Sequence, residues 1–316
     1  MIARAHVFHD EYKVRDFKPQ DLCYAKGMFR IYADLTKFGI VIFVVLSGLA
    51  GYATSFAIET PFQWIHFLNL IGGLFFLSSG SLALNQVQEY KIDQKMPRTS
   101  KRPVASGKLK PAAAGILAVA FLVIGSDLLF KSSEMAGLLG WATVVLYNGI
   151  YTYWWKPKWV FAAIPGAIPG ALPVTIGYAA NDSRIWSLDS IYLFLILFLW
   201  QMPHFWALAI RFKDDYVKGG VPTLPAALGI HKTLYHMGLW TFLYVVIAVG
   251  SPWIVHASWI YFLVVMPFAF KILQEFFRFY KSEGKERWLA FFMWVNLSVL
   301  VFLFVPVVDK WIFLIQ

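Results

Sequence analysis

Cysteine and charged residues are scarce in this chain of 316 residues, and each scarcity excludes a class of protein. The single cysteine, Cys23, cannot form an internal disulfide and rules out a cysteine-rich metal site. Charged residues make up only 15% of the sequence, whereas 59% is hydrophobic and 18% aromatic, with a mean hydropathy of +0.60. Soluble domains rarely reach these values, so we expect a polytopic membrane protein. Residues 1–34 also lack an apolar stretch, and we expect no cleavable secretion signal there.

Apolar stretches of bilayer length recur along the rest of the sequence. We count nine, near residues 36–58, 63–84, 112–131, 135–155, 159–180, 188–210, 234–255, 258–276 and 288–308. They predict an all-α membrane bundle of about nine transmembrane helices. We expect residues 35–316 to form this single domain and residues 1–34 to form a cytoplasmic N-terminal segment.

The net charge of +10 is distributed unevenly over the predicted loops. If the N-terminus is cytoplasmic, 25 lysines and arginines lie on the cytoplasmic side and three on the other. This bias follows the positive-inside rule. The basic excess is therefore a topology signal that requires no nucleic acid as partner, and it favours an integral protein of the bacterial inner membrane whose partner is the lipid bilayer.

Three polar side chains end the second span. Asn85, Glu89 and Asp93 are four residues apart, so they share one face of a helix. Acidic groups at a helix C-terminus oppose its dipole, which already places roughly −0.5 charge there. A cation would relieve this cost, and hard oxygen ligands suit Mg²⁺. The basic run over residues 96–103 follows directly and suits the diphosphate half of a metal–diphosphate.

A second acidic cluster follows the sixth span. Asp214 and Asp215 come after the segment Trp200–Trp206, at a helix end that should reach the same membrane face as Asp93. Two acidic clusters from different helices can each hold a cation and clamp a diphosphate between them. Together with the basic run, they indicate a prenyl-diphosphate site.

The fifth predicted span contains three prolines, Pro165, Pro169 and Pro173, interleaved with small residues. Proline removes helical hydrogen bonds, and small residues let neighbouring helices approach closely. The pattern fits either a kinked packing helix or a bent wall that widens a central cavity.

The first motif, which runs from Asn85 to Pro103, resembles the first signature of the UbiA-type intramembrane prenyltransferases. The second, Trp200–Trp206 with Lys213–Tyr216 and residues 220–225, resembles the branch of that family that acts on haem. The resemblance implies helices around a central cavity open to the cytoplasmic side. It also implies transfer of a farnesyl group from farnesyl diphosphate to a vinyl group of haem b, with addition of water and release of diphosphate. Haem b would be a substrate, and a downstream haem-modifying enzyme is a plausible partner.

Site roles follow from the same resemblance. It implies that Mg²⁺, or Mn²⁺ in its place, is held by Asn85, Glu89, Asp93, Asp214 and Asp215. The groups that neutralise the diphosphate would be Arg98, Lys101, Arg102 and Lys156. Aromatic faces can stabilise an allylic cation, and candidates for the haem or prenyl pocket are Tyr147, Tyr151, Trp206 and His204.

The sequence is compatible with three roles for His204. It could ligate haem iron, line the site, or hydrogen-bond within the bundle. The sequence also departs from the family in places: Glu89 stands where aspartate is more common, and residues 157–160 differ from the polar stretch expected after Lys156.

Three other readings compete with haem farnesylation. A relative that prenylates a quinone precursor or chlorin would use the same metal site. A transporter would keep its acids near the membrane midplane, whereas here they cluster at one face. A non-catalytic haem chaperone would not need two acidic clusters.

Overall fold

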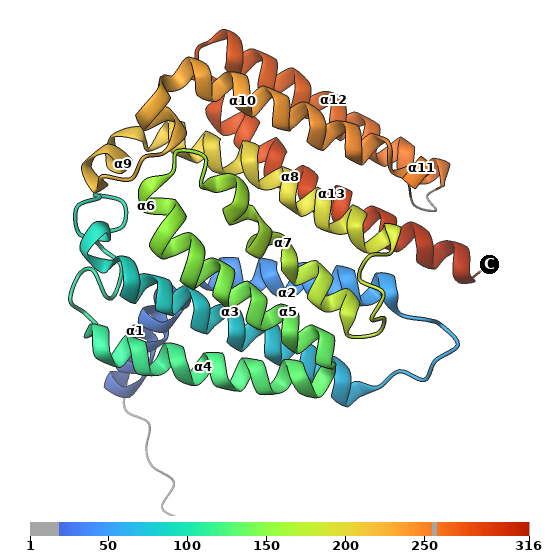
Figure 1. Cartoon of the computed structure of the whole chain (residues 1–316), viewed down its shortest axis with the longest axis horizontal. Helices are drawn as coiled ribbons and strands as arrows, with labels where there is room; N and C mark the ends of the chain where they lie inside the picture. The colour runs from blue at the N-terminus through green and yellow to red at the C-terminus, as the bar shows by residue number, and fades with distance from the viewer. Residues whose placement is uncertain (1–18, 255–257, 316) are drawn as a thin grey trace, which may run out of the picture.

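Helices make up most of the chain in the computed structural model, which describes residues 19–254 and 258–315 (Figure 1). No strand occurs within these two ranges. The prediction of an all-α fold is therefore confirmed. The helices are α1 (Pro19–Thr36), α2 (Phe38–Ser55), α3 (Trp64–Asp93), α4 (Pro111–Ser132), α5 (Glu134–Val144), η1 (Val145–Trp155), α6 (Lys156–Lys158), α7 (Ala163–Ala179), α8 (Leu188–Arg211), α9 (Lys213–Gly219), α10 (Leu224–Val249), α11 (Ser251–Ile254), α12 (Trp259–Lys281) and α13 (Trp288–Ile315).

Seven of these helices are long and apolar enough to cross a membrane: α2, α3, α4, α8, α10, α12 and α13. The two remaining predicted spans, 135–155 and 159–180, coincide with α5 continued by η1 and with the shorter helix α7. Each predicted span thus has a helical counterpart, while the number of crossings stays a prediction. The predicted domain boundary between residues 34 and 35 falls in the last turn of α1.

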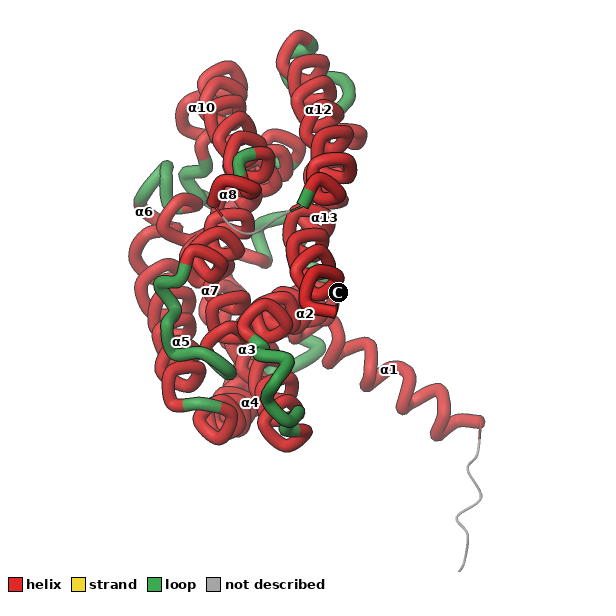
Figure 2. Tube along the Cα trace, turned by 90° about the vertical axis from the view of Figure 1, so that its right-hand side faces the viewer, coloured by secondary structure: helices red, strands yellow, loops and turns green. Residues whose placement is uncertain are grey.

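The helices lie side by side in an elongated bundle (Figure 1). Helices α10 and α12 form one edge and α4 the other, with α2, α7 and α8 between them. Helix α1 projects away from the bundle (Figure 2). The short helices α6 and α9 lie at the left-hand end in Figure 1, so the segments that carry the predicted site motifs gather at one end of the molecule.

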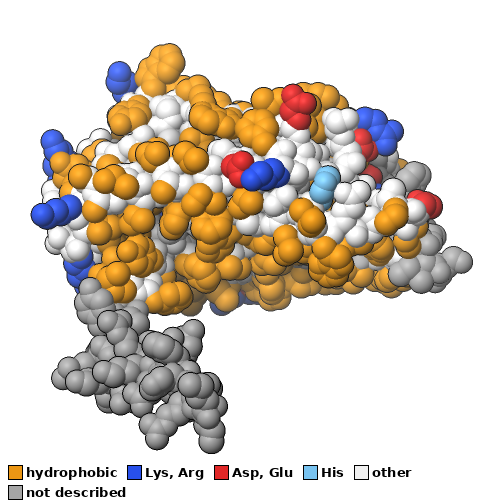
Figure 3. Space-filling view, turned by 90° about the horizontal axis from the view of Figure 1, so that it is seen from below, with side chains coloured by type: hydrophobic (Ala, Val, Ile, Leu, Met, Phe, Trp, Pro, Cys, Tyr) orange, Lys and Arg blue, Asp and Glu red, His pale blue; other side chains and the backbone are white. Residues whose placement is uncertain are grey.

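The outer surface is apolar over most of its length. Figure 3 shows hydrophobic side chains across one face, with lysines and arginines mostly at its left-hand end and others in the middle and at the right. Large apolar side chains such as Leu68, Ile116 and Leu263 are exposed on α3, α4 and α12. Exposed apolar area of this extent requires a lipid surrounding, and the chain is an integral membrane protein.

Helix α7 owes its position to close packing against α2. A Cβ added at Gly51 would lie 1.9 Å from the carbonyl oxygen of Val174, and one at Gly177 would lie 1.8 Å from that of Gly48. Only glycine permits backbones to approach this closely. Because Pro169 and Pro173 are inside α7, the helix also lacks two of its own backbone hydrogen-bond donors.

Candidate active site

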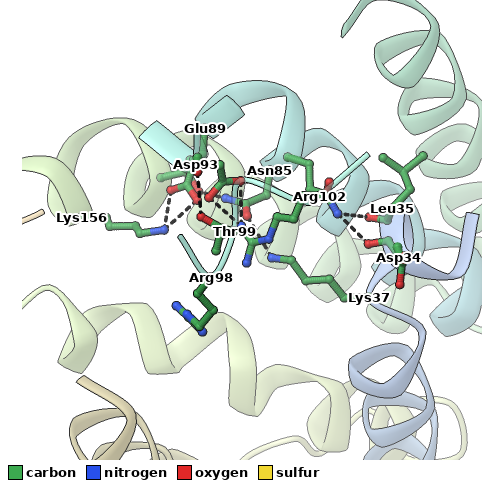
Figure 4. A network of polar contacts seen from close by, with 12 residues as sticks. Asp34, Leu35, Lys37, Asn85, Glu89, Asp93, Arg98, Thr99, Arg102 and Lys156 are labelled. Atoms are coloured by element: carbon green, nitrogen blue, oxygen red, sulfur yellow. Dashed lines mark hydrogen bonds and ion pairs between the residues drawn. The ribbon is translucent and has the colours of Figure 1, made fainter. Parts of the chain in front are cut away.

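The three polar residues predicted on one helix face do share the C-terminal end of α3 (Figure 4). The exposed fractions are 1% for Asn85, 5% for Glu89 and 1% for Asp93. Buried carboxylates are costly unless they are paired with charged or hydrogen-bonding partners. The surroundings of these three side chains therefore decide what the site can do.

Each of the three side chains accepts hydrogen bonds from a different cation. Lys37 Nζ is 3.2 Å from Asn85 Oδ1. Lys156 Nζ lies 2.6 and 2.7 Å from the two carboxylate oxygens of Glu89. Arg102 Nη1 lies 2.8 Å from both carboxylate oxygens of Asp93. Three oxygen-bearing groups and three cations therefore meet at the end of α3, as Figure 4 shows.

Lys156 and Glu89 form an ion pair in which both carboxylate oxygens are engaged. Burial by itself would lower the pKa of Lys156, but the Glu89 carboxylate together with Tyr151 and Tyr147 outweighs burial and holds this pKa above its ordinary value. Lys156 is thus a fixed positive charge at the end of η1, where the resemblance placed a basic residue.

The segment directly before Lys156 is a π-helix, η1, which the sequence did not predict. Thr152 Oγ1 donates to the carbonyl oxygen of Tyr147, five residues earlier. Asn148 ties η1 to α3, because its Nδ2 donates to the carbonyl oxygen of Ser81 and to Gln88 Oε1. π-Helical turns are frequent at functional sites, and here one sets the position of Lys156 relative to Glu89.

The second acidic cluster is linked to the first through the loop at residues 94–110. The backbone N–H of Arg98 donates to Asp215 Oδ2 at 3.1 Å. Arg98 Nη2 donates to the Tyr216 hydroxyl, and the guanidinium lies 4.8 Å from the Phe212 ring centroid. The structure therefore brings Arg98 and Asp215 together.

Two predicted site residues are exposed and lie outside these contacts, namely Lys101 in the loop and Asp214 on α9. Met96 is buried against Ala209, Tyr216 and Val221. The loop thus rests on α9 through apolar contacts, while the side chains of Lys101 and Asp214 stay accessible to solvent.

The donor set at α3 fits a divalent cation in chemistry. Within the described residues no three Asp, Glu, His or Cys side chains converge on one point. Asn85, Glu89 and Asp93 nevertheless supply amide and carboxylate oxygens, the donors that Mg²⁺ prefers. The cationic nitrogen at each of these groups shows that the position favours positive charge.

An apolar cavity of about 230 Å³ lies among α2, α3, η1 and α7. Gly166, Pro169, Gly170 and Pro173 of α7 form part of its wall, while the same helix packs closely against α2. Tyr147 also lines it and stacks on Tyr151, with ring centroids 5.8 Å apart. The lining residues are Ile40, Val44, Leu74, Leu77, Ser78, Ser81, Leu82, Thr143, Val144, Tyr147, Gly166, Pro169, Gly170, Pro173, Ile176 and Gln201.

His204 and Trp206 lie in helix interfaces rather than in the lining of this cavity. His204 Nδ1 is 2.8 Å from Asn296 Oδ1 on α13, and its ring lies between Trp200 and Phe292. Trp206 is fully buried and packs edge-on against Trp240 of α10. Of the three roles left open for His204, the structure favours a hydrogen bond within the bundle.

Sequence reasoning missed three polar residues of the site: Lys37, Asn148 and Thr152. Lys37 is a single basic residue at the start of the first apolar span. The positive-inside rule accounts for a lysine at that place, so its sequence position did not indicate a role in the site. Asn148 and Thr152 are uncharged residues inside an apolar span. The contact of Thr152 with Tyr147, five residues earlier, depends on the π-helix, which the sequence did not predict.

The chain belongs to the UbiA prenyltransferase family, whose sequence model matches residues 42–297. The fold and site therefore define a prenyl-transferring enzyme of the membrane. A relative from Bdellovibrio bacteriovorus, named protoheme IX farnesyltransferase, is 66% identical over 287 residues, which cover 91% of this chain and 98% of the relative. The predicted family membership is thus confirmed.

Solved structures share the fold. One, described as digeranylgeranylglyceryl phosphate synthase, has a TM-score of 0.73 at 18% identity and covers 89% of this chain and 98% of its own. A UbiA homologue from Archaeoglobus fulgidus bound to GPP and Mg²⁺ has a TM-score of 0.58 at 14% identity, covering 87% of this chain and 99% of its own. At such identities the likeness concerns the fold alone.

Proposed function

We propose that this protein is a haem O synthase, a protohaem IX farnesyltransferase. It transfers the farnesyl group of farnesyl diphosphate to a vinyl group of haem b, adds water and releases diphosphate. The 66% identical relative that bears this name supports the choice of acceptor and donor.

The observation that carries the proposal is the junction of a charged site with an apolar cavity on one helix. Ser81 lines the cavity, and Asn85 follows one turn later on α3, where the cations gather. An amphipathic prenyl diphosphate has the same division, with an anionic head and an apolar tail. The head would bind at the end of α3 and the tail would extend along the cavity.

Metal ligands in this proposal are Asn85, Glu89, Asp93, Asp214 and Asp215. A divalent ion held there, Mg²⁺ or Mn²⁺, would supply positive charge to the leaving diphosphate. The groups proposed to hold the diphosphate oxygens are Arg98, Lys101, Arg102 and Lys156. Because Lys156 and Arg102 already contact Glu89 and Asp93, they stand next to the place where that charge develops.

The chemistry breaks the bond between the farnesyl C1 and the diphosphate oxygen. C1 then bonds to the terminal carbon of the vinyl group, water oxygen bonds to the inner carbon, and one proton leaves. Tyr147 lines the cavity and stacks on Tyr151, and in this proposal their rings face the allylic cation. Cation–π attraction of this kind contributes about 2 kcal/mol or more when it is desolvated.

The membrane orientation is part of the proposal. The basic loops lie at the end of the bundle that holds α6 and α9, so the positive-inside rule places this end, with the N-terminus, in the cytoplasm. The cavity and charged site would then open to the cytoplasmic side of a bacterial inner membrane. A downstream enzyme would take up the modified haem.

The test uses purified protein in detergent with haem b and farnesyl diphosphate, with and without Mg²⁺. We expect a Mg²⁺-dependent gain in haem mass equal to a farnesyl group plus a hydroxyl, read by mass spectrometry. If farnesyl diphosphate is consumed while haem stays unmodified, the acceptor is not haem b, and we would then expect a quinone precursor or chlorin as the acceptor. Folded protein that consumes no farnesyl diphosphate would refute the proposal.

A further inference from the structure

Lys37 forms the turn between α1 and α2 in an unusual backbone conformation. Its φ of 51° and ψ of 57° are left-handed, which L side chains other than asparagine and aspartate seldom adopt. Glycine would fit this turn with less strain. The lysine side chain is therefore the feature to explain, and it reaches Asn85 Oδ1 across 48 residues of sequence.

The charges at the site are unequally matched. Glu89 is paired with Lys156, and Asp93 with Arg102. The hydrogen bond that Lys37 donates goes to the neutral amide of Asn85, and within the described residues Lys37 makes no ion pair. The ammonium of Lys37 is thus the cation of this cluster without a carboxylate in contact, and a bound anion would supply the missing partner.

We propose that Lys37 is a further diphosphate-binding residue, whose ammonium occupies the Asn85 oxygen while the site is free of metal and substrate. This inference rests on the proposed function. A divalent ion that takes Asn85 Oδ1 must displace the ammonium, and a bound diphosphate gives the ammonium a new partner. Metal and diphosphate therefore strengthen each other's binding, with Lys37 as the coupling group.

Figure 4 supports this arrangement, because Lys37 and Arg102 extend toward Asn85 and Asp93 from different segments of the chain. Lys37 approaches from the start of α2 and Arg102 from the loop after α3. An anion at this point would be met by cations from two sides. Such convergence of charge-assisted donors is what phosphate groups require.

The test measures binding of inorganic diphosphate and of Mg²⁺ to the full-length protein in detergent by calorimetry. With Mg²⁺ present, Lys37→Met should weaken diphosphate binding about 10- to 100-fold, the range expected for loss of a charge-assisted hydrogen bond. With Mg²⁺ alone, the same variant should bind the metal at least as tightly as the parent protein, because the competing ammonium is gone.

Two further variants separate the side chain from the turn. Lys37→Gly should lose diphosphate affinity as Lys37→Met does, without a lower melting temperature, since glycine suits the left-handed turn. Glu283→Gly is the matched control, because Glu283 is exposed and also has a left-handed φ of 53°. It should leave diphosphate binding unchanged.

The outcomes distinguish the two proposals. If the parent protein binds no diphosphate in the presence of Mg²⁺, the proposed function fails at its first step. If the parent binds it and Lys37→Met binds it equally well, the role of Lys37 is refuted while the function stands. Equal losses of Mg²⁺ and diphosphate binding, together with a lower melting temperature, would show a purely structural lysine and would also overturn the inference.

Discussion

Replacing Ser78 with phenylalanine should shorten the apolar cavity and shift the preference of the enzyme from farnesyl to geranyl diphosphate. Ser78 lines the cavity from α3, seven residues before Asn85. At 1.5 Å per residue it lies roughly 10 Å along the helix from the charged end, and Leu74 lies roughly 16 Å away. A large ring at Ser78 would therefore close off the part of the cavity that lies beyond it, toward Leu74.

The magnitude follows from the apolar surface that would be excluded. Farnesyl exceeds geranyl by one isoprene unit of five carbons. At about 0.8 kcal/mol for each buried carbon, exclusion of that unit costs at most about 4 kcal/mol. This corresponds to roughly a thousandfold loss of farnesyl preference. Since neighbouring side chains relax around the new ring, we expect a shift of at least about tenfold.

The assay offers Ser78→Phe an equimolar mixture of the two diphosphates with haem b and compares the two products by mass spectrometry. Leu68→Phe is the control, because Leu68 is an exposed residue on the same helix. The control should keep the parent ratio. An unchanged ratio in folded, active Ser78→Phe would refute the assignment of this cavity to the prenyl chain.

Three other predictions concern charged contacts. Asp93→Asn should abolish Mg²⁺-dependent turnover while the protein still folds; turnover with a normal Mg²⁺ response would exclude Asp93 as a metal ligand. Arg98→Ala removes the contacts of the loop with Tyr216 and should increase proteolytic cleavage within residues 94–110 severalfold; unchanged cleavage would show that other contacts hold the loop. Arg287→Ala removes a bidentate pair with the buried Glu275, so the free energy of unfolding should fall by about 2 kcal/mol with the specific activity preserved, and an unchanged melting temperature would contradict this.

Local patterns were enough to predict the helices and the polar face of α3. The spacing of Asn85, Glu89 and Asp93 determines their common face because helical geometry acts over a few residues. The length of the apolar stretches predicted where the long helices lie, because it too is a local property of the sequence. The criterion of length fails for α7, which has 17 residues but still packs within the bundle.

Pairings between distant segments could not be read from the sequence. Lys37 and Lys156 lie 48 and 67 residues from the groups they contact, and no local pattern specifies such a separation. His204 and Trp206 show the same limit, because the sequence does not specify the register of α8 against α10 and α13. In the structure, His204 contacts Asn296 of α13 and Trp206 contacts Trp240 of α10.

Ion pairs alone would not have identified this site. Glu275 is as buried as Asp93 and has three cationic partners, Lys271, Arg278 and Arg287. That cluster joins the ends of α12 and α13, and none of its members lines the apolar cavity. Buried pairs are weak evidence for stability and no evidence for function by themselves. What distinguishes the α3 cluster is its neighbour: on one helix, a single turn separates the cavity-lining Ser81 from Asn85, so one amphipathic substrate can fill both.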